Sequence, residues 1–200
     1  MISRSDEEFE KILTNPILDI AARFWDAERY EAFKICYRSM REIDDLVDHR
    51  KASGNPLTQT ELAEFRNRIK EKMETLADPQ ASGELAQTLT RFQIPSWPWL
   101  RLSEAMDYDL EHNGFSTFQV FLRYCEGAAI APAAVFVHLC GVKKEREEFC
   151  APEFDIRKCA RDLALFSYLV QTAFLQYIVG EIIKIPLLIF FKIPQNMHQI

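Results

Sequence analysis

The segment 33–48 has the sequence FKICYRSMREIDDLVD, in which apolar side chains recur at intervals of three and four residues. This spacing places them along one side of an α-helix, where they can pack on a core. The positions on that side are Phe33, Cys36, Tyr37, Met40, Ile43 and Val47. Because Asn15-Pro16 is a typical helix start and Ser53-Gly54 a turn signal, the pattern predicts one helix over about 17–51.

Helical spacing continues on the C-terminal side of this segment. It predicts further helices over about 58–76, 83–92, 97–112, 116–139 and 156–179. Pro132 should kink or split the helix that contains it. No run alternates apolar and polar residues, so we expect no paired strands in residues 1–170. The expected fold class is all-α, a bundle of long helices in a single domain over residues 1–200.

The charge composition excludes one class of partner. The 200 residues carry a formal net charge of -6, and no stretch combines clustered Lys and Arg with aromatic residues. Nucleic acid is therefore not an expected partner, because affinity for its phosphate backbone comes mainly from clustered cations. An acidic protein that handles a phosphorylated ligand needs a local basic patch or divalent cations as a bridge.

The cysteines and the first residues bear on the cellular compartment. The five cysteines are odd in number and none is paired at C-x-x-C spacing, which is typical of reduced thiols in a cytosolic protein. The N-terminal residues MISRSDEEFEK are acidic and lack the apolar stretch of a signal peptide. We therefore expect a cytoplasmic protein.

The C-terminal part differs in composition from the rest of the chain. No charged residue lies between Leu163 and Gly180, a length at the threshold for crossing a membrane. Ser167 and Gln171 are among the polar residues that interrupt it, which favours a buried central helix over a membrane span. The tail 171–200 is rich in Ile and Phe beyond Gly180, which would favour self-association or peripheral membrane association.

Asp44 and Asp48 are the sharpest chemical feature of the sequence. They are four residues apart, so their carboxylates lie about one turn apart on one face of a helix, while Asp45 points elsewhere. Like charges at this spacing destabilise an isolated helix, and a divalent cation between them would reverse that penalty. Two interpretations follow: a diphosphate–Mg²⁺ site, or a solvated acidic face paired with Arg41 and His49.

Tyr37, Arg41, Asp44 and Asp48 together follow the pattern of a known family. Segment 37–48 resembles the first aspartate-rich helix of squalene and phytoene synthases, which has a Tyr, then an Arg four residues later, then carboxylates four apart. The four residues of this chain match that pattern one by one.

A second stretch is similar to the same family in order and spacing. It consists of MDYDL at 106–110, FSTF at 115–118 and then Tyr124-Cys125, and it resembles the family's segment leading to its Tyr-Cys helix. The resemblance covers about residues 15–170.

The resemblance implies a fold, a reaction and a set of site residues. The fold would be an isoprenoid synthase-like helical bundle, and the reaction the head-to-head condensation of two isoprenoid diphosphates with Mg²⁺ as cofactor. Asp44 and Asp48 would bind the metal and take part in catalysis. Arg41 and Tyr37 would bind substrate. Tyr37 and Tyr124 would also act at the reaction centre, where an allylic cation forms in an apolar cavity.

The chain departs from the family pattern at the second acidic motif. That motif should follow the stretch LFSYLV at 165–170, but the sequence there is QTAFL at 171–175, and the one acid further on is Glu181. The resemblance therefore implies a prenyltransferase that is weak or inactive in this form. Two alternatives stay open: a non-catalytic binding or assembly protein that keeps the fold, and a truncated or frameshifted product that departs from the family from about residue 171.

Overall fold

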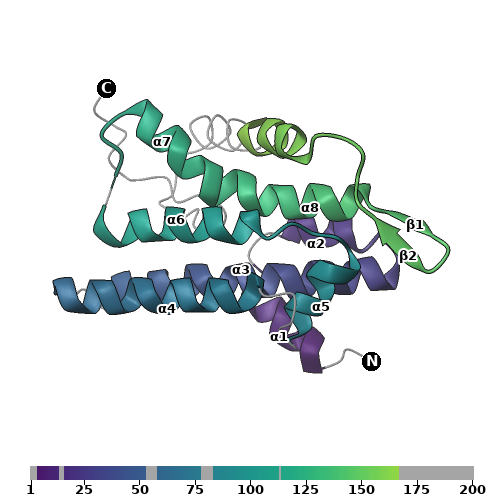
Figure 1. The fold of residues 1–200 in the computed structure, drawn as a ribbon, viewed down its shortest axis with the longest axis horizontal. Helices are drawn as coiled ribbons and strands as arrows, with labels where there is room; N and C mark the ends of the chain where they lie inside the picture. The colour runs from purple at the N-terminus through teal and green to yellow at the C-terminus, as the bar shows by residue number, and fades with distance from the viewer. Residues whose placement is uncertain (1–3, 14–15, 53–57, 78–82, 113, 167–200) are drawn as a thin grey trace, which may run out of the picture.

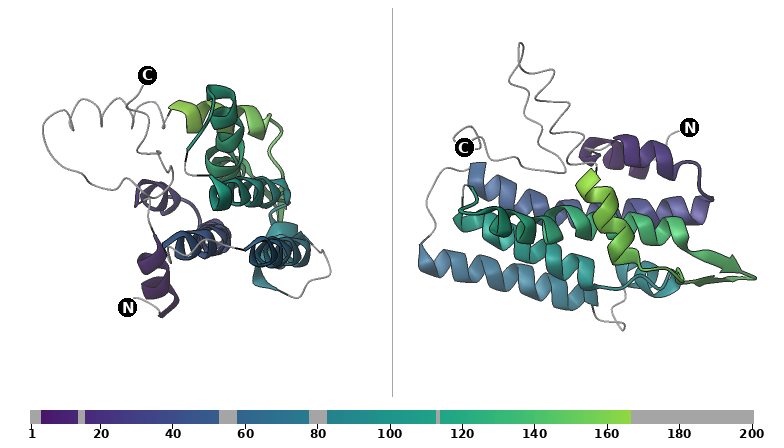
Figure 2. Two further views of the ribbon diagram at one scale, coloured as in Figure 1. Left: turned by 90° about the vertical axis from the view of Figure 1, so that its left-hand side faces the viewer. Right: turned by 90° about the horizontal axis from the view of Figure 1, so that it is seen from above.

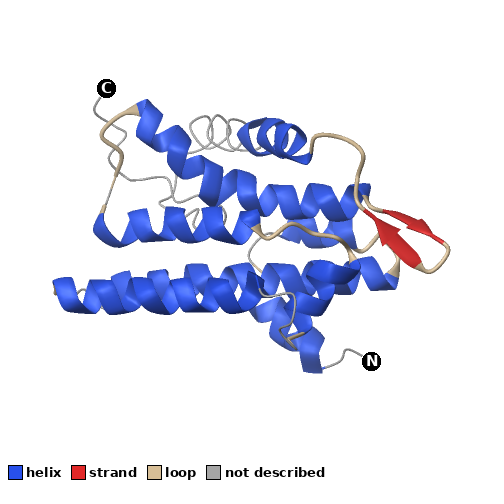
Figure 3. Cartoon of the chain, in the orientation of Figure 1, coloured by secondary structure: helices blue, strands red, loops and turns tan. Residues whose placement is uncertain are grey.

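The computed structural model describes residues 4–13, 16–52, 58–77, 83–112 and 114–166. They form a bundle of helices with one short β-hairpin (Figures 1 and 3). The elements are α1 (Arg4–Ile12), α2 (Pro16–Ala22), α3 (Ala27–Ala52), α4 (Gln59–Ala77), α5 (Glu84–Arg91), α6 (Trp97–Glu111), α7 (Phe118–Cys125), the π-helical turn η1 (Glu126–Ile130), α8 (Ala131–Gly141), β1 (Lys143–Glu145) and β2 (Glu148–Cys150). Residues 156–166 form a further helix. The expected helical bundle is confirmed.

Helix α3 lies at the centre of the bundle. It contacts α1, α2, α5, α6 and α8, and Figure 2 shows these helices arranged around it. All six side chains predicted for its apolar side are buried. Burying a large apolar side chain stabilises a fold by about 1.5–3 kcal/mol, so this one face of α3 holds much of the core together.

Three helices begin at capping side chains that the sequence supplies. At the start of α4, Thr58 and Glu61 form a reciprocal capping box: the Thr58 amide donates to the Glu61 carboxylate at 2.9 Å, and the Glu61 amide to the Thr58 hydroxyl at 3.3 Å. Thr117 accepts from the Val120 amide at 3.2 Å and begins α7. Asp26 accepts from the Arg29 amide at 2.9 Å and begins α3.

The predicted single helix over 17–51 is wrong in one respect, because the chain breaks between α2 and α3 at residues 23–26. The break is stabilised by side chains on both sides of it. Asp19 is buried, and it accepts from Arg23 Nε at 2.7 Å and from the Tyr30 hydroxyl at 2.7 Å. These contacts satisfy the buried Asp19 carboxylate only when α2 turns back toward α3.

The expectation of no paired strands in residues 1–170 is also wrong. Strands β1 and β2 form an antiparallel hairpin, shown in red in Figure 3. Its two-residue loop begins at Arg146 with φ of 58°, the positive value that the favoured two-residue loops need at their first position. The sequence gives no Asn-Gly or Asp-Gly signal there, and each strand has 3 residues, too short for alternation to be seen.

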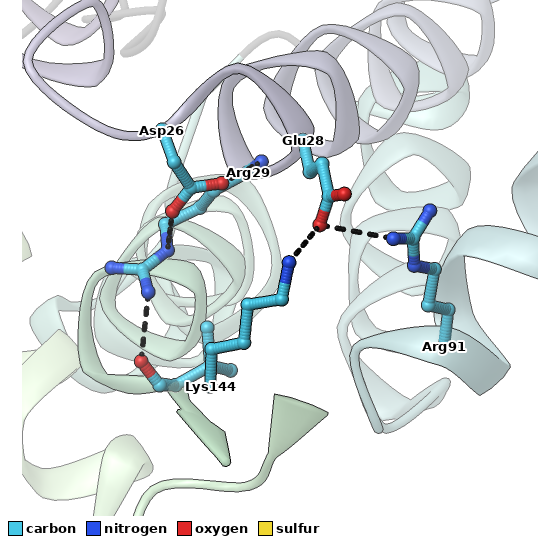
Figure 4. A network of polar contacts seen from close by, with 6 residues as sticks. Asp26, Glu28, Arg29, Arg91 and Lys144 are labelled. Carbon is cyan, nitrogen blue, oxygen red and sulfur yellow. Dashed lines mark hydrogen bonds and ion pairs between the residues drawn. The ribbon is translucent and has the colours of Figure 1, made fainter. Parts of the chain in front are cut away.

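The hairpin is anchored to the helices by ion pairs and by one aromatic contact. Figure 4 shows the Glu28 carboxylate between Lys144 Nζ at 3.0 Å and an Arg91 guanidinium nitrogen at 2.9 Å. The buried ring of Phe149 stacks on Phe92 with centroids 4.2 Å apart. Exposed ion pairs contribute little on their own, so the buried ring accounts for most of this attachment.

The other predicted helices agree with the structure. Those over 58–76, 83–92 and 97–112 are confirmed within two residues at each end. The distortion expected near Pro132 takes the form of the π-helical turn η1, directly before α8. The predicted helix over 156–179 is present at 156–166, and residues 167–179 lie outside the described part of the chain.

Gly127, in η1, allows the closest approach between α6 and the π-helical turn. A Cβ atom at this position would lie 2.7 Å from the Ala105 Cβ and closer still to the Arg101 carbonyl oxygen. Backbone cannot move aside as the end of a flexible side chain can, so the contact requires glycine.

We predict that Gly127→Ala lowers the free energy of unfolding by about 2–3 kcal/mol or more, because it forces α6 and η1 apart. Gly83→Ala is the matched control, since a Cβ at Gly83 meets no atom within 4 Å. It should cost less than about 1 kcal/mol, the scale of an N-cap effect. Urea unfolding of both variants measures the difference, and equal stabilities would contradict the close-packing argument.

Candidate functional site

Asp44 and Asp48 lie on the central helix, in the half that faces α6. Because α3 is uninterrupted from Ala27 to Ala52, the two carboxylates keep the one-turn spacing that the sequence predicts. The Asp44 side chain is 29% exposed, and Asp48 is also partly buried. The pair is therefore neither fully solvated nor fully enclosed.

Arg41 is the immediate counterion of this acidic face. One of its guanidinium nitrogens pairs with Asp44 and the other with Asp45. The Arg41 side chain is 15% exposed, and its buried Nε makes no hydrogen bond with any described residue. The guanidinium is thus held beside Asp44, where it partly offsets the charge of the acidic pair.

Tyr124, on α7, is the next predicted site residue. Its hydroxyl donates to Asp109 Oδ2 at 2.8 Å, and both side chains are buried. Burial raises the pKa of Tyr124 well above its ordinary value, and the negative charges of Asp109 and Asp44 raise it further. Asp109 of α6 and Tyr124 of α7 thus form one buried pair, and the negative charge of Asp44 on α3 also acts on the phenol.

Asp109 is the site residue that sequence analysis missed. It lies within the MDYDL stretch, which carried the family resemblance but gave Asp109 no role. The signal was present, because Asp109 continues the i, i+3, i+4 series of buried residues on α6: Leu102, Ala105 and Met106. Asp107 and Glu111 lie on the other side of α6 and pair with Arg66 of α4 at 2.5 and 2.6 Å.

Aromatic rings surround the Tyr124 phenol. The Phe115 ring lies 5.0 Å from it and the Tyr108 ring 6.0 Å, both between centroids. Phe121 extends the group, 5.3 Å from Phe115. Tyr108, Phe115, Phe121 and Tyr124 thus form one aromatic cluster, and aromatic faces attract cations.

Tyr37 is placed differently from the other predicted site residues. It is buried, and its ring contacts Phe9 at 5.6 Å and Phe33 at 5.7 Å. These contacts give Tyr37 a part in the aromatic core between α1 and α3. The structure therefore brings Arg41, Asp44 and Tyr124 together, whereas the ring contacts of Tyr37 lie within the core.

The donor set limits how a metal could be held. Among the described residues, no group of three or more His, Cys, Asp or Glu side chains is placed to hold a metal ion. Two carboxylates one turn apart fit Mg²⁺ that takes its remaining ligands from phosphate oxygens and water, which is the usual case for this ion. Glu126, which follows Cys125, pairs with Arg161 at 3.9 Å and lies on the opposite side of the helix from Tyr124.

Two phenols with raised pKa values predict how the stability of the fold depends on pH. Burial and the neighbouring Asp19 raise the pKa of Tyr30 to about 12, and the pKa of Tyr124 is also raised. Below pH 10 both phenols are neutral in the folded and the unfolded chain. Above pH 10 the unfolded phenols lose protons that the folded ones keep, so the free energy of unfolding falls by about 1.4 kcal/mol per pH unit for each phenol.

We therefore expect Tyr124→Phe and Tyr30→Phe each to flatten the decline in stability above pH 10 by about that amount per unit. Urea unfolding at several pH values between 8 and 11 measures the slopes. If Tyr124→Phe keeps the parent slope, the phenol is not held protonated by its surroundings.

Comparison with known proteins supports the resemblance. The squalene/phytoene synthase family model matches residues 19–172. The chloroplastic phytoene synthase of Cucumis melo is 28% identical over 120 residues, which are 60% of this chain and 28% of that protein. The chain thus spans little more than a quarter of the length of this curated relative. No solved structure gives a significant match.

The family match includes both stretches on which the resemblance rests, the Asp44–Asp48 helix face and the segment that ends at Tyr124. It extends over most of the described helices, from α2 to the helix at 156–166. The chain therefore belongs to the squalene/phytoene synthase family.

Proposed function

We propose that the face of α3 bearing Asp44 and Asp48 binds the diphosphate of an isoprenoid diphosphate through Mg²⁺. The protein would be a head-to-head prenyltransferase of the squalene/phytoene synthase type, weak or inactive in this form. The observation that carries the proposal is the convergence of Asp44, Asp109 and Tyr124 from three helices, since a merely solvated acidic face would not adjoin a buried phenol.

Each residue of the site has a proposed role. Bound Mg²⁺ would neutralise charge on the leaving diphosphate. Asp44 and Asp48 would hold that ion, and Arg41, already beside Asp44, would turn part of its guanidinium to a phosphate oxygen. Tyr37 would support the substrate-facing side of α3 from the core. Tyr124 and its aromatic neighbours would line the position of the hydrocarbon and exclude water from it.

The proposal of weak turnover rests on the number of acidic helices. Ionising a prenyl diphosphate requires that charge developing on the leaving group be neutralised, and the family resemblance divides this task between two aspartate-rich motifs. The stretch QTAFL at 171–175 has no acid where the second motif is expected. Removing one preorganised electrostatic partner commonly costs about a hundredfold or more in rate.

A binding or assembly protein that keeps the fold without the chemistry is the second candidate. It is favoured by the sequence QTAFL at 171–175, which has no acid where the second acidic motif is expected. In that case the site would still take a prenyl diphosphate, or another apolar anion, without converting it.

Membrane association is a further part of the proposal. Phe118–Gly141 is a helical stretch of 24 residues apolar enough to cross a membrane, with 44% of its most apolar window buried, so a role as a core helix explains it equally well. Ile17, Ile20 and Phe24 of the α2 region are exposed. We propose a cytoplasmic protein that associates peripherally with membranes or with itself through such apolar residues.

The metal proposal predicts synergy between two ligands. Mg²⁺ and geranylgeranyl diphosphate together should raise the melting temperature more than either alone, because the site supplies two carboxylates and the diphosphate supplies the remaining ligands. At a hundredfold excess over Kd the gain is about 2.7 kcal/mol, or roughly 5–10 °C. Asp44→Ala with Asp48→Ala should abolish it.

The control for this experiment changes the same net charge elsewhere. Glu104→Ala with Glu153→Ala removes two exposed carboxylates, which pair only with Arg101 and Lys143 in the described structure. This double variant should keep the parent's ligand-induced shift. An equal shift in the Asp44/Asp48 variant and the parent would disprove the metal site.

For turnover we predict little or no head-to-head product from this chain, at least about a hundredfold below an enzyme with both acidic motifs. The measurement is incubation with Mg²⁺ and farnesyl or geranylgeranyl diphosphate, followed by analysis of the apolar extract. Robust product would show that the second motif is dispensable or replaced, with Glu126 and Glu181 the first residues to replace by Gln.

A further inference from the structure

Asp109 occupies a position where a carboxylate is costly. It is 7% exposed and lies among the buried residues of α6, in a layer that also contains Leu102 and Met106. A charged group buried in this way destabilises the fold unless specific partners compensate for lost hydration. Such a residue calls for an explanation beyond packing, since an apolar side chain would fill the same space more favourably.

The geometry of its contact with Tyr124 fixes the phenol's hydrogen. Tyr124 Oη donates to Asp109 Oδ2 at 2.8 Å. A phenol has one hydrogen to donate and lone pairs to accept with, so committing the hydrogen to Asp109 leaves the oxygen's lone pairs and the ring for other neighbours. Asp44, on α3, adds a second negative charge near the same phenol.

We infer that Asp109 is a positioning residue, which holds the Tyr124 hydroxyl as a donor so that Tyr124 meets a ligand as an electron-rich acceptor. The inference deepens the proposed function and rests on it: the ligand group concerned is the positively charged or electron-poor allylic carbon, not the diphosphate. Tyr124 in this arrangement does not protonate the leaving diphosphate, because its proton is already committed to Asp109.

Three features of the surroundings agree with this role. Phe115 and Tyr108 present further ring faces around Tyr124, and such faces favour a cation. The pKa of Tyr124 is raised, mainly by burial and then by Asp109, so the phenol stays neutral and keeps its donor hydrogen. The Arg41 guanidinium on α3 pairs with Asp44 and Asp45.

Two probes, each used with Mg²⁺, measure binding at the two ends of the ligand separately. Inorganic pyrophosphate reports on the acidic face of α3, and a geranylgeranyl ammonium with pyrophosphate adds a mimic of the allylic cation. Asp109→Asn should weaken binding of the ammonium about tenfold and leave pyrophosphate binding unchanged. Tyr124→Phe should do the same, and the double variant should be no worse than either single one.

Asp107→Asn is the matched control. It makes the same chemical change two residues away on α6, at a side chain that is 41% exposed and pairs with Arg66. It should leave both probes unaffected. A purely structural role for Asp109 would lower the melting temperature of Asp109→Asn without changing the affinity ratio of the two probes. That result, or additive effects of the two single variants, would overturn the inference.

A second measurement does not depend on ligand binding. Absorbance titration of tyrosinate, taken as the difference between parent and Tyr124→Phe, should show Tyr124 neutral at pH 10.5. In Asp109→Asn the phenol should ionise roughly one to three pH units lower than in the parent. If the parent binds neither probe, the proposed function fails, and an unchanged titration would then refute the positioning role as well. If Asp109→Asn does not fold, the binding of both probes to Tyr124→Phe tests the positioning role instead. Loss of pyrophosphate binding in Tyr124→Phe would refute that role.

Discussion

The burial of one face of α3 is the constraint on which the rest of the structure depends. Helices α1, α2, α5, α6 and α8 all pack against it, and its largest apolar residues are almost fully removed from water. Because a helix repeats every 3.6 residues, fixing the apolar face also fixes the direction of every other side chain on α3. The burial of Phe33, Ile43 and Val47 therefore determines the direction in which Asp44 and Asp48 point.

Polar contacts then decide how the neighbouring elements attach to this helix. At its N-terminal end, the buried Asp19 carboxylate receives Arg23 and Tyr30 and turns α2 back against α3. Glu28 receives Lys144 and Arg91 and holds the hairpin beside α5. These contacts are strong where they are buried and weak where they are exposed, so Asp19 contributes more to the arrangement than Glu28 does.

The candidate site also combines apolar burial with polar contacts, and polar contacts make up a larger part of it. Arg41 pairs with both Asp44 and Asp45, and Tyr124 is a neutral hydrogen-bond donor to Asp109. A partly exposed acidic face near a buried phenol suits a ligand that has a metal-bound anion at one end and an apolar or cationic group at the other. Membership of the squalene/phytoene synthase family agrees with a ligand of that kind.

Local rules account for what the sequence by itself determined. Helical periodicity placed the apolar face of α3 and the range of α4, the Asn15-Pro16 signal placed the start of α2, and four-residue spacing put Asp44 and Asp48 on one face. The tertiary structure alone decided the break at 23–26, the hairpin, and the pairing of Asp109 with Tyr124. Each of these depends on contacts between different elements, and the hairpin also on distant ones, since the Gln93 side chain donates to the Phe149 carbonyl across 56 residues at 2.8 Å. Local pattern cannot reveal such contacts, because which buried polar groups meet is settled only when the helices pack.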